Sequence, residues 1–134
     1  MKNILTLCLL IFHCVAYAEW VEVGFSEERT FRMYYDPASI KKSGDIATVK
    51  TLKNFYNPQQ SVDPNKPYIY LSRITNQEIK CSENKERPLT IEMWSQLNGS
   101  GIMEQSHDYV EKKDWGKRYK ITSIENAVIS GACK

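Results

Sequence analysis

The stretch YIYLSRITNQEIKC, from Tyr68 to Cys81, decides the fold of this chain. It contains no glycine or proline, and β-branched and aromatic residues recur along it, which is typical of a β-strand. If no bulge intervenes, the odd-numbered residues from Ile69 onward lie on one face and the even-numbered residues on the other. The sequence therefore predicts a long strand that ends in a cysteine.

Segments of the same kind occur before and after this strand. They alternate apolar with polar residues and are separated by turn-forming residues. Strands are expected over residues 20–24, 31–35, 46–56, 89–94 and 102–110. Turns are expected at Asp36 to Ser39, at Ser43 to Asp45 and at Asn98 to Gly101, and the longest loop at Asn57 to Pro67, where Pro58, Pro64 and Pro67 interrupt any regular element.

The C-terminal segment changes from the period of a strand to that of a helix. Ser123 can cap a helix. Apolar residues then recur at helical spacing, at Ile124, Ala127, Val128 and Ala132. This helix is expected to lay its apolar stripe on the sheet. The fold class is therefore α+β: a twisted antiparallel sheet of about six strands with one C-terminal helix packed on a face.

The first residues have the pattern of an export signal. Lys2 is followed by the apolar stretch Ile4 to Val15, and small residues precede Glu19, which favours cleavage at that point. The apolar stretch is shorter than the ~20 residues that a membrane-spanning helix needs. The sequence therefore predicts a cleavable signal peptide over residues 1–18, a single domain over residues 19–134, and no membrane span in the mature chain.

Cleavage would leave an even pair of cysteines. Cys8 and Cys14 leave with the signal peptide, and neither follows a small residue, so no lipidation is expected. Cys81 and Cys133 remain in an oxidising compartment, where they are expected to form one disulfide that fastens the helix to the sheet. A reactive thiol pair is the alternative, but the two cysteines lie far apart and no C-x-x-C motif is present.

The charges are nearly balanced, with 18 basic and 16 acidic residues in the full chain. This balance does not suit a nucleic-acid-binding protein, which concentrates positive charge. His107 is the only histidine of the mature chain, so neither a metal site nor a cofactor is predicted. Paired carboxylates occur at Glu27–Glu28 and at Glu83 to Glu86, but both pairs lie in expected turns beside basic residues and indicate a solvated surface. The sequence thus predicts a protein that is not an enzyme.

Aromatic residues are numerous in this chain. Most of them are expected in the core or over the edges of the sheet. A minority on the outward face, beside Lys53, Lys66 and Arg73, would form a binding surface of the kind that tyrosine and arginine make at interfaces.

The order of several short motifs along the chain is distinctive. A strand with the sequence EWVEV at residues 19–23 is followed by YYDPASI at residues 34–40, and then by the long strand that contains LSR and ends in EIKC. RPL at residues 87–89, a glycine hairpin, Trp115, and a helix from Ser123 to Cys133 complete the set. No single motif is specific, but the ordered set resembles the surface-adhesin protein E family of Gram-negative bacteria over essentially the whole mature chain.

The resemblance implies an antiparallel sheet with a C-terminal helix and a disulfide, as the residues themselves predict. It also implies a cell-envelope protein that binds host matrix or plasma proteins such as vitronectin, laminin and plasminogen, and the family is associated with haem binding and homodimers. Host binding is associated with the segment that leads into the Ser72-Arg73 strand, here Asn65 to Tyr70. The candidate ligand-binding residues are therefore Lys66, Tyr68, Tyr70 and Arg73.

Two functions follow as hypotheses. The first is a binding module at the outer surface that recognises host proteins. The second is a soluble module of the periplasm that has an endogenous envelope partner and no adhesin activity, which a cleavable leader without lipidation favours. A small hydrolase or redox enzyme is a third class, which a deep pocket with a serine or glutamate beside His107 would favour.

Overall fold

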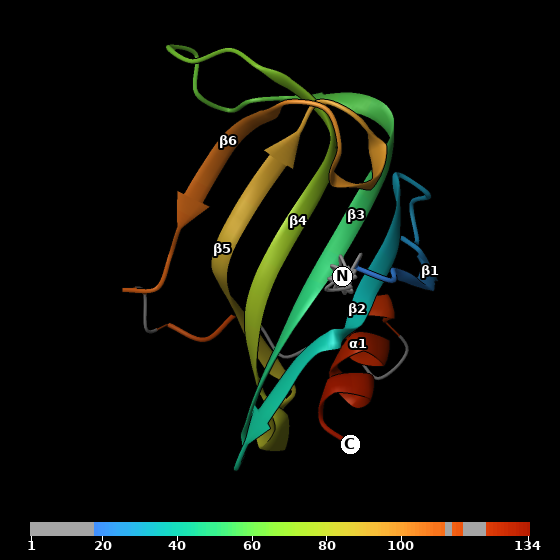
Figure 1. Ribbon diagram of the computed structural model, residues 1–134, viewed down its shortest axis with the longest axis vertical. Coiled ribbons are helices and arrows are strands. Elements are labelled where there is room, and N and C mark those ends of the chain that lie inside the picture. The colour runs from blue at the N-terminus through green and yellow to red at the C-terminus, as the bar shows by residue number, and fades with distance from the viewer. Residues whose placement is uncertain (1–17, 112–113, 117–122) are drawn as a thin grey trace, which may run out of the picture.

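The computed structural model describes residues 18–111, 114–116 and 123–134. Its strands form one antiparallel sheet in which each strand pairs with its neighbours in the chain (Figure 1). In this order they are β1 (Val21–Phe25), β2 (Phe31–Ser43), β3 (Ile46–Gln60), β4 (Ile69–Lys80), β5 (Lys85–Trp94) and β6 (Met103–Asp108). The helices are α1 (Ile124–Ala132) and the short 3₁₀ helices η1 (Cys81–Glu83) and η2 (Leu97–Gly99). The predicted α+β class is confirmed, whereas the predicted signal peptide, including Cys8 and Cys14, lies outside the described residues except for Ala18.

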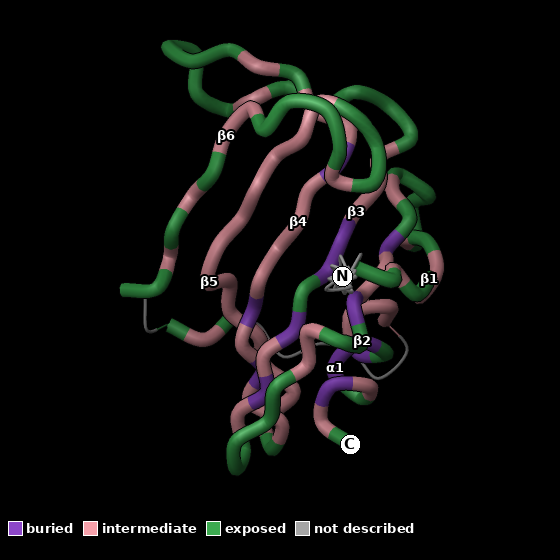
Figure 2. The backbone as a smooth tube through the Cα atoms, in the orientation of Figure 1, coloured by how far each residue is buried: buried purple, intermediate pink, exposed green. Residues whose placement is uncertain are grey.

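The core lies where the helix meets the first half of the sheet. The helix packs on β1, β2 and β3. The sheet contributes Met33, Ala47, Val49 and Ile79 to the core, and the helix contributes Val128, Ile129 and Ala132. Figure 2 shows these buried positions (purple) along β3 and α1, while the connections at the upper end of the sheet are exposed.

The helix begins at the predicted cap but turns a slightly different face to the sheet. The Ser123 hydroxyl accepts a hydrogen bond from the Asn126 N–H at 3.1 Å. Ala127, which the sequence placed in the apolar stripe, is exposed, and Ile129 is buried instead. Because the two residues flank the stripe on opposite sides, a small rotation of the helix buries the larger side chain, which removes more apolar surface from water.

A disulfide joins Cys81 to Cys133, with the two Cα atoms 5.7 Å apart, as the sequence predicted. Cys81 directly follows β4, and Cys133 directly follows the helix. The same end of the sheet is also held by Asp45 in the β2–β3 turn. Its carboxylate accepts hydrogen bonds from the backbone N–H and the hydroxyl of Ser82, at 2.8 and 2.6 Å.

The turn predicted at Asp36 to Ser39 is wrong, because β2 continues through these residues with a shift of register. The Asp36 carboxylate accepts the Ala38 N–H at 3.0 Å, and the Ser39 hydroxyl donates to the Asp36 carbonyl at 2.7 Å. That hydroxyl also accepts the Lys50 N–H of the neighbouring strand at 2.8 Å. These bonds replace missing bonds of the ladder, so turn-forming residues produce a bulge here instead of a reversal.

Two other strands are longer than predicted. β3 continues to Gln60, and Pro58 lies within a shift of register between Asn54 and Gln59, a place where a strand tolerates proline. The loop that follows therefore spans only residues 61–68. β5 begins at Lys85, so Glu86 lies in a strand and not in the expected turn.

The β5–β6 connection covers the upper part of the face of the sheet opposite the helix. Ser72 is fully buried there, where its hydroxyl donates to the Gln96 carbonyl at 2.5 Å and accepts the Gly99 N–H at 2.9 Å. Gly99 has a φ of +64°, and a Cβ at this position would lie 2.4 Å from the Ile74 side chain. The expected turn is confirmed, and its positive φ and its close approach to the Ile74 side chain both favour glycine.

Replacing Ser72 by alanine is expected to lower the free energy of unfolding by about 2 kcal/mol, because two backbone groups lose their partner on this face. Urea unfolding followed by tryptophan fluorescence measures the change. Ser43→Ala at the exposed end of β2 is the matched control and should cost less than about 0.5 kcal/mol. Equal and small effects of the two substitutions would contradict the assigned role of the Ser72 hydroxyl.

Candidate binding surface

The loop between β3 and β4, residues 61–68, projects from the upper end of the sheet and is closed by Ser61 (Figure 1). The Ser61 N–H donates to the Tyr68 carbonyl at 2.9 Å. The Ser61 hydroxyl donates to the Lys66 carbonyl at 2.9 Å and accepts the Tyr68 N–H at 3.2 Å. One serine therefore ties the two ends of the loop together.

The tip of the loop is also internally bonded. The Asp63 carboxylate accepts the Asn65 N–H at 2.9 Å, and the Asp63 carbonyl accepts the Lys66 N–H at 3.2 Å. Pro64 and Pro67, which flank Asn65 and Lys66, each have a fixed φ angle. A loop that is ordered in this way loses little conformational entropy when it binds a partner.

The loop presents apolar surface to solvent. Val62 is fully exposed and Ile69, the first residue of β4, is 55% exposed. Beside them lies an open groove of about 390 Å³, within the size range of ligand-binding clefts. It is lined by Gln60, Ser61, Asp63, Pro64, Pro67, Tyr68 and Ile69. Exposed aliphatic and aromatic groups on an ordered projection are typical of a protein-binding surface.

Aromatic rings continue from this loop across the sheet. The Tyr68 ring lies 5.9 Å from that of Tyr70, which meets Phe55 edge-on at 5.6 Å. Phe55 in turn contacts Phe31 at 5.8 Å. Burial raises the pKa of the Tyr68 phenol, and the nearby hydroxyls of Tyr70 and Tyr109 add to the effect. Tyr68 therefore stays an uncharged hydrogen-bond donor at neutral pH.

The four predicted ligand-binding residues divide between two places. Tyr68 and Tyr70 are in contact, and exposed Lys66 lies in the same loop. Arg73 lines a separate small cavity together with Lys53. Sequence reasoning missed Val62 and Ile69, because a single apolar residue in a loop or at the start of a strand gives no periodic signal.

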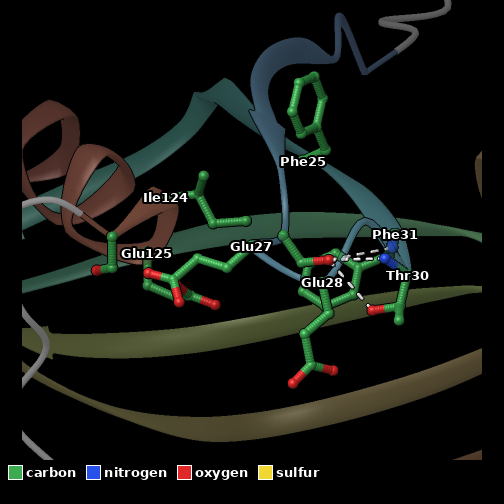
Figure 3. A pocket seen from close by; sticks show the side chains of 9 residues that line it. Phe25, Glu27, Glu28, Thr30, Phe31, Ile124 and Glu125 are labelled. Carbon is green, nitrogen blue, oxygen red and sulfur yellow. Dashed lines mark hydrogen bonds between the residues drawn. The ribbon is translucent and has the colours of Figure 1, made fainter.

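A second hollow of about 390 Å³ lies between the β1–β2 turn and the start of the helix (Figure 3). Phe25, Phe31 and Ile124 supply apolar walls, while Glu27, Glu28 and Glu125 supply carboxylates. The turn is shaped by the Ser26 hydroxyl, which accepts the Thr30 N–H at 2.9 Å. Glu27 and Glu28 are exposed, so the predicted solvated surface is confirmed for this pair.

The second pair of carboxylates is separated by the fold. Glu83 in η1 is bound by the ammonium groups of Lys80 and Lys85, which hold the pKa of its carboxyl down to about 2. Glu86 lies in β5, where its carboxylate accepts a hydrogen bond from the Gln77 side chain at 2.7 Å. The two groups thus bind different partners.

His107 lies on β6, opposite Ile91, with its ring 6.1 Å from that of Tyr109. The neighbouring Asp108 carboxylate accepts the Val110 N–H at 2.9 Å. Among the described residues, no three His, Cys, Asp or Glu side chains gather where they could hold a metal ion.

Comparison with known families gives a match that covers almost the whole predicted mature domain. The family described as surface-adhesin protein E matches residues 20–134. The chain belongs to the surface-adhesin protein E family. Members of an adhesin family are surface or exported proteins that bind other proteins. Family membership assigns these general properties to the chain. Within the described residues, no helix has the length and apolar character needed to cross a membrane.

The fold is similar to that of a solved structure. The structure of Haemophilus influenzae protein E is 12% identical, covers 83% of this chain and 85% of that chain, and gives a TM-score of 0.50. Its selenomethionine form is 13% identical, covers 83% of each chain and gives a TM-score of 0.47. No curated protein matches the sequence.

Proposed function

We propose that this adhesin-family protein is an exported binding protein of the bacterial envelope that recognises a protein partner through the loop at residues 61–68. Host matrix or plasma proteins, such as vitronectin, laminin and plasminogen, are the candidate partners, because the family resemblance links host binding to Asn65 to Tyr70, which overlaps this loop. The observation that supports the proposal most directly is an ordered loop that holds fully exposed Val62 beside an apolar groove.

The proposed role is binding without catalysis. Support comes from the carboxylate pairs, of which one is solvated and the other is divided between different partners. Tyrosine and aliphatic side chains around the loop provide the chemistry that concentrates binding energy at protein interfaces.

Val62→Asp is expected to weaken binding to the partner at least tenfold, because a carboxylate at the centre of the contact would have to lose its water. The measurement is saturation binding of the purified protein to immobilised vitronectin, laminin and plasminogen. Val110→Asp, at a valine that is 57% exposed beyond β6, is the matched control and should bind as the wild type does.

Two results would contradict the proposal. One is the absence of saturable binding by the wild-type protein at micromolar concentration, and the other is an equal loss for both aspartate variants. Proteolysis of intact cells provides the localisation arm. A protein that is protected in intact cells and released only by osmotic shock would favour the alternative, a periplasmic module with an endogenous partner.

A further inference from the structure

A small cavity lies on the face of the sheet that carries the helix. Its lining is largely polar and is separate from the proposed binding loop. Its volume is about 160 Å³. It is lined by Met33, Thr51, Lys53, Arg73, Thr75, Gln77, Glu86, Pro88 and Ile91. A cavity of ~150 Å³ holds one benzene-sized molecule. This cavity therefore suits one functional group on a short stem and not a whole drug-sized ligand.

Arg73 carries donors that the fold leaves unused. Its Nε atom is buried and has no hydrogen-bond partner. Among the described residues, its guanidinium also takes part in none of the ion pairs found in the chain. Buried donors are nearly always satisfied in folded proteins, because an unsatisfied one costs its full desolvation. Arg73 lines the cavity and has an unsatisfied donor, which points to a missing acceptor.

A second cation lies directly across from Arg73. Lys53 on β3 is its register partner on β4, an arrangement that places two like charges opposite each other. Lys53 is mostly buried, with its ammonium 4.2 Å from the centre of the Phe31 ring and 3.7 Å from the Glu125 carboxylate. Burial lowers the pKa of Lys53, and the charge of Arg73 lowers it further. The carboxylates of Glu125 and Glu86 act in the opposite direction and raise it in part. Two cations therefore face each other on this side of the cavity, with two carboxylates close by.

The other polar groups of the lining bond mainly to one another. The Gln77 amide donates to the Glu86 carboxylate at 2.7 Å. The Thr51 hydroxyl lies 3.5 Å from the Gln77 side-chain oxygen and the same distance from the Thr75 carbonyl. The two carboxylates near the cations already have partners. Glu86 bonds to Gln77, and Glu125 pairs with Lys53. The donors left over on the cavity wall belong to Arg73.

We propose that this cavity binds a carboxylate group, held by the guanidinium of Arg73 and the ammonium of Lys53. A planar carboxylate matches the fork of an arginine and accepts two parallel hydrogen bonds from one edge of it. The small volume admits the carboxylate with a short alkyl stem, and Met33 and Ile91 line the same space with apolar groups. The carboxylate belongs either to a small organic acid or to an acidic side chain of another protein.

The test is thermal unfolding of the exported, oxidised protein in sodium acetate, with sodium chloride at the same ionic strength as reference. Wild-type protein is expected to show a rise in Tm that saturates with acetate, as a ligand of the native state produces. Arg73→Gln should need at least tenfold more acetate for the same rise. Lys50→Gln, at an exposed lysine of β3, is the matched control and should keep the wild-type response.

A second probe distinguishes the source of the carboxylate. The blocked peptide acetyl-Gly-Glu-Gly-amide should compete in the same assay if the group is a protein side chain, whereas a response to acetate alone assigns the cavity to small acids. If neither probe raises the Tm beyond its value in chloride, the proposal is overturned.

If Arg73→Gln does not fold, the wild-type protein still gives an answer by NMR. Acetate is expected to shift the Arg73 Nε–H resonance in a saturable way. An unchanged resonance across the titration would overturn the proposal. Because Val62 lies in the loop and Arg73 lines the separate cavity, the carboxylate site and the binding loop can fail independently.

Discussion

Replacing both Cys81 and Cys133 by serine is expected to lower the free energy of unfolding by about 4 kcal/mol. The disulfide closes a loop between residues that are 52 positions apart, and its loss restores that much freedom to the unfolded chain. For a domain of this size the Tm should fall by about 15 °C. Differential scanning calorimetry of the exported protein measures both quantities.

The helix should respond to this change before the sheet does. A helix of 9 residues is unstable alone in water and depends on its contacts with β1, β2 and β3. Each strand of the sheet keeps its ladder when the disulfide is lost. Amide hydrogen exchange in the double-serine variant should therefore accelerate over α1 first, with β3 and β4 still protected.

Reduced wild-type protein is the control for this variant, and it should unfold with the same Tm as the double-serine protein. Serine substitution removes the sulfur atoms from the core edge as well as the covalent bond, so agreement between the two would assign the effect to the bond. A fall in Tm of less than about 3 °C in either protein would contradict the expected contribution of the disulfide.

Ile79→Ala is expected to cost about 3–4 kcal/mol, the second largest effect. Ile79 is fully buried on β4, an interior strand of the sheet, in the core that includes Val128 and Ile129 of the helix. Removal of its branched side chain would lose the free energy gained by transferring that side chain from water into the core. It would also leave a cavity that cannot close, because β4 is held by pairing on both sides. Equilibrium unfolding in urea measures the difference.

Ile69→Ala is the matched control, since it makes the same substitution at the other end of the same strand. Ile69 is 55% exposed, so its loss should cost less than about 1 kcal/mol. Similar costs at both positions would show that burial does not set the stability of β4 and would contradict the described core.

The elements that could be predicted are those in which local pattern and tertiary context agree. The long alternation before Cys81 indicated a strand, and the change of period after Ser123 indicated a capped helix. The cysteine pair could be assigned because an exported chain with two cysteines allows only one intramolecular bridge.

What could not be predicted depends on register. Asp36 to Ser39 have the composition of a turn, but bonds to the neighbouring strand keep the chain extended. The opposition of Lys53 to Arg73 is equally invisible in the sequence. It depends on how β3 and β4 align below the irregularity between Asn54 and Gln59, which no alternation pattern determines.

The disulfide also decides how this chain would carry mechanical tension. A force applied to the two ends of the domain would pass from Cys81 directly to Cys133 through the S–S bond. The segment between them, which contains β5 and β6, would carry no load. About 180 Å of contour length, at ~3.5 Å per residue, would therefore not extend. Only the part before Cys81 could lengthen under load, so the oxidised protein behaves as a short tether whose last two strands and helix are shielded from extension.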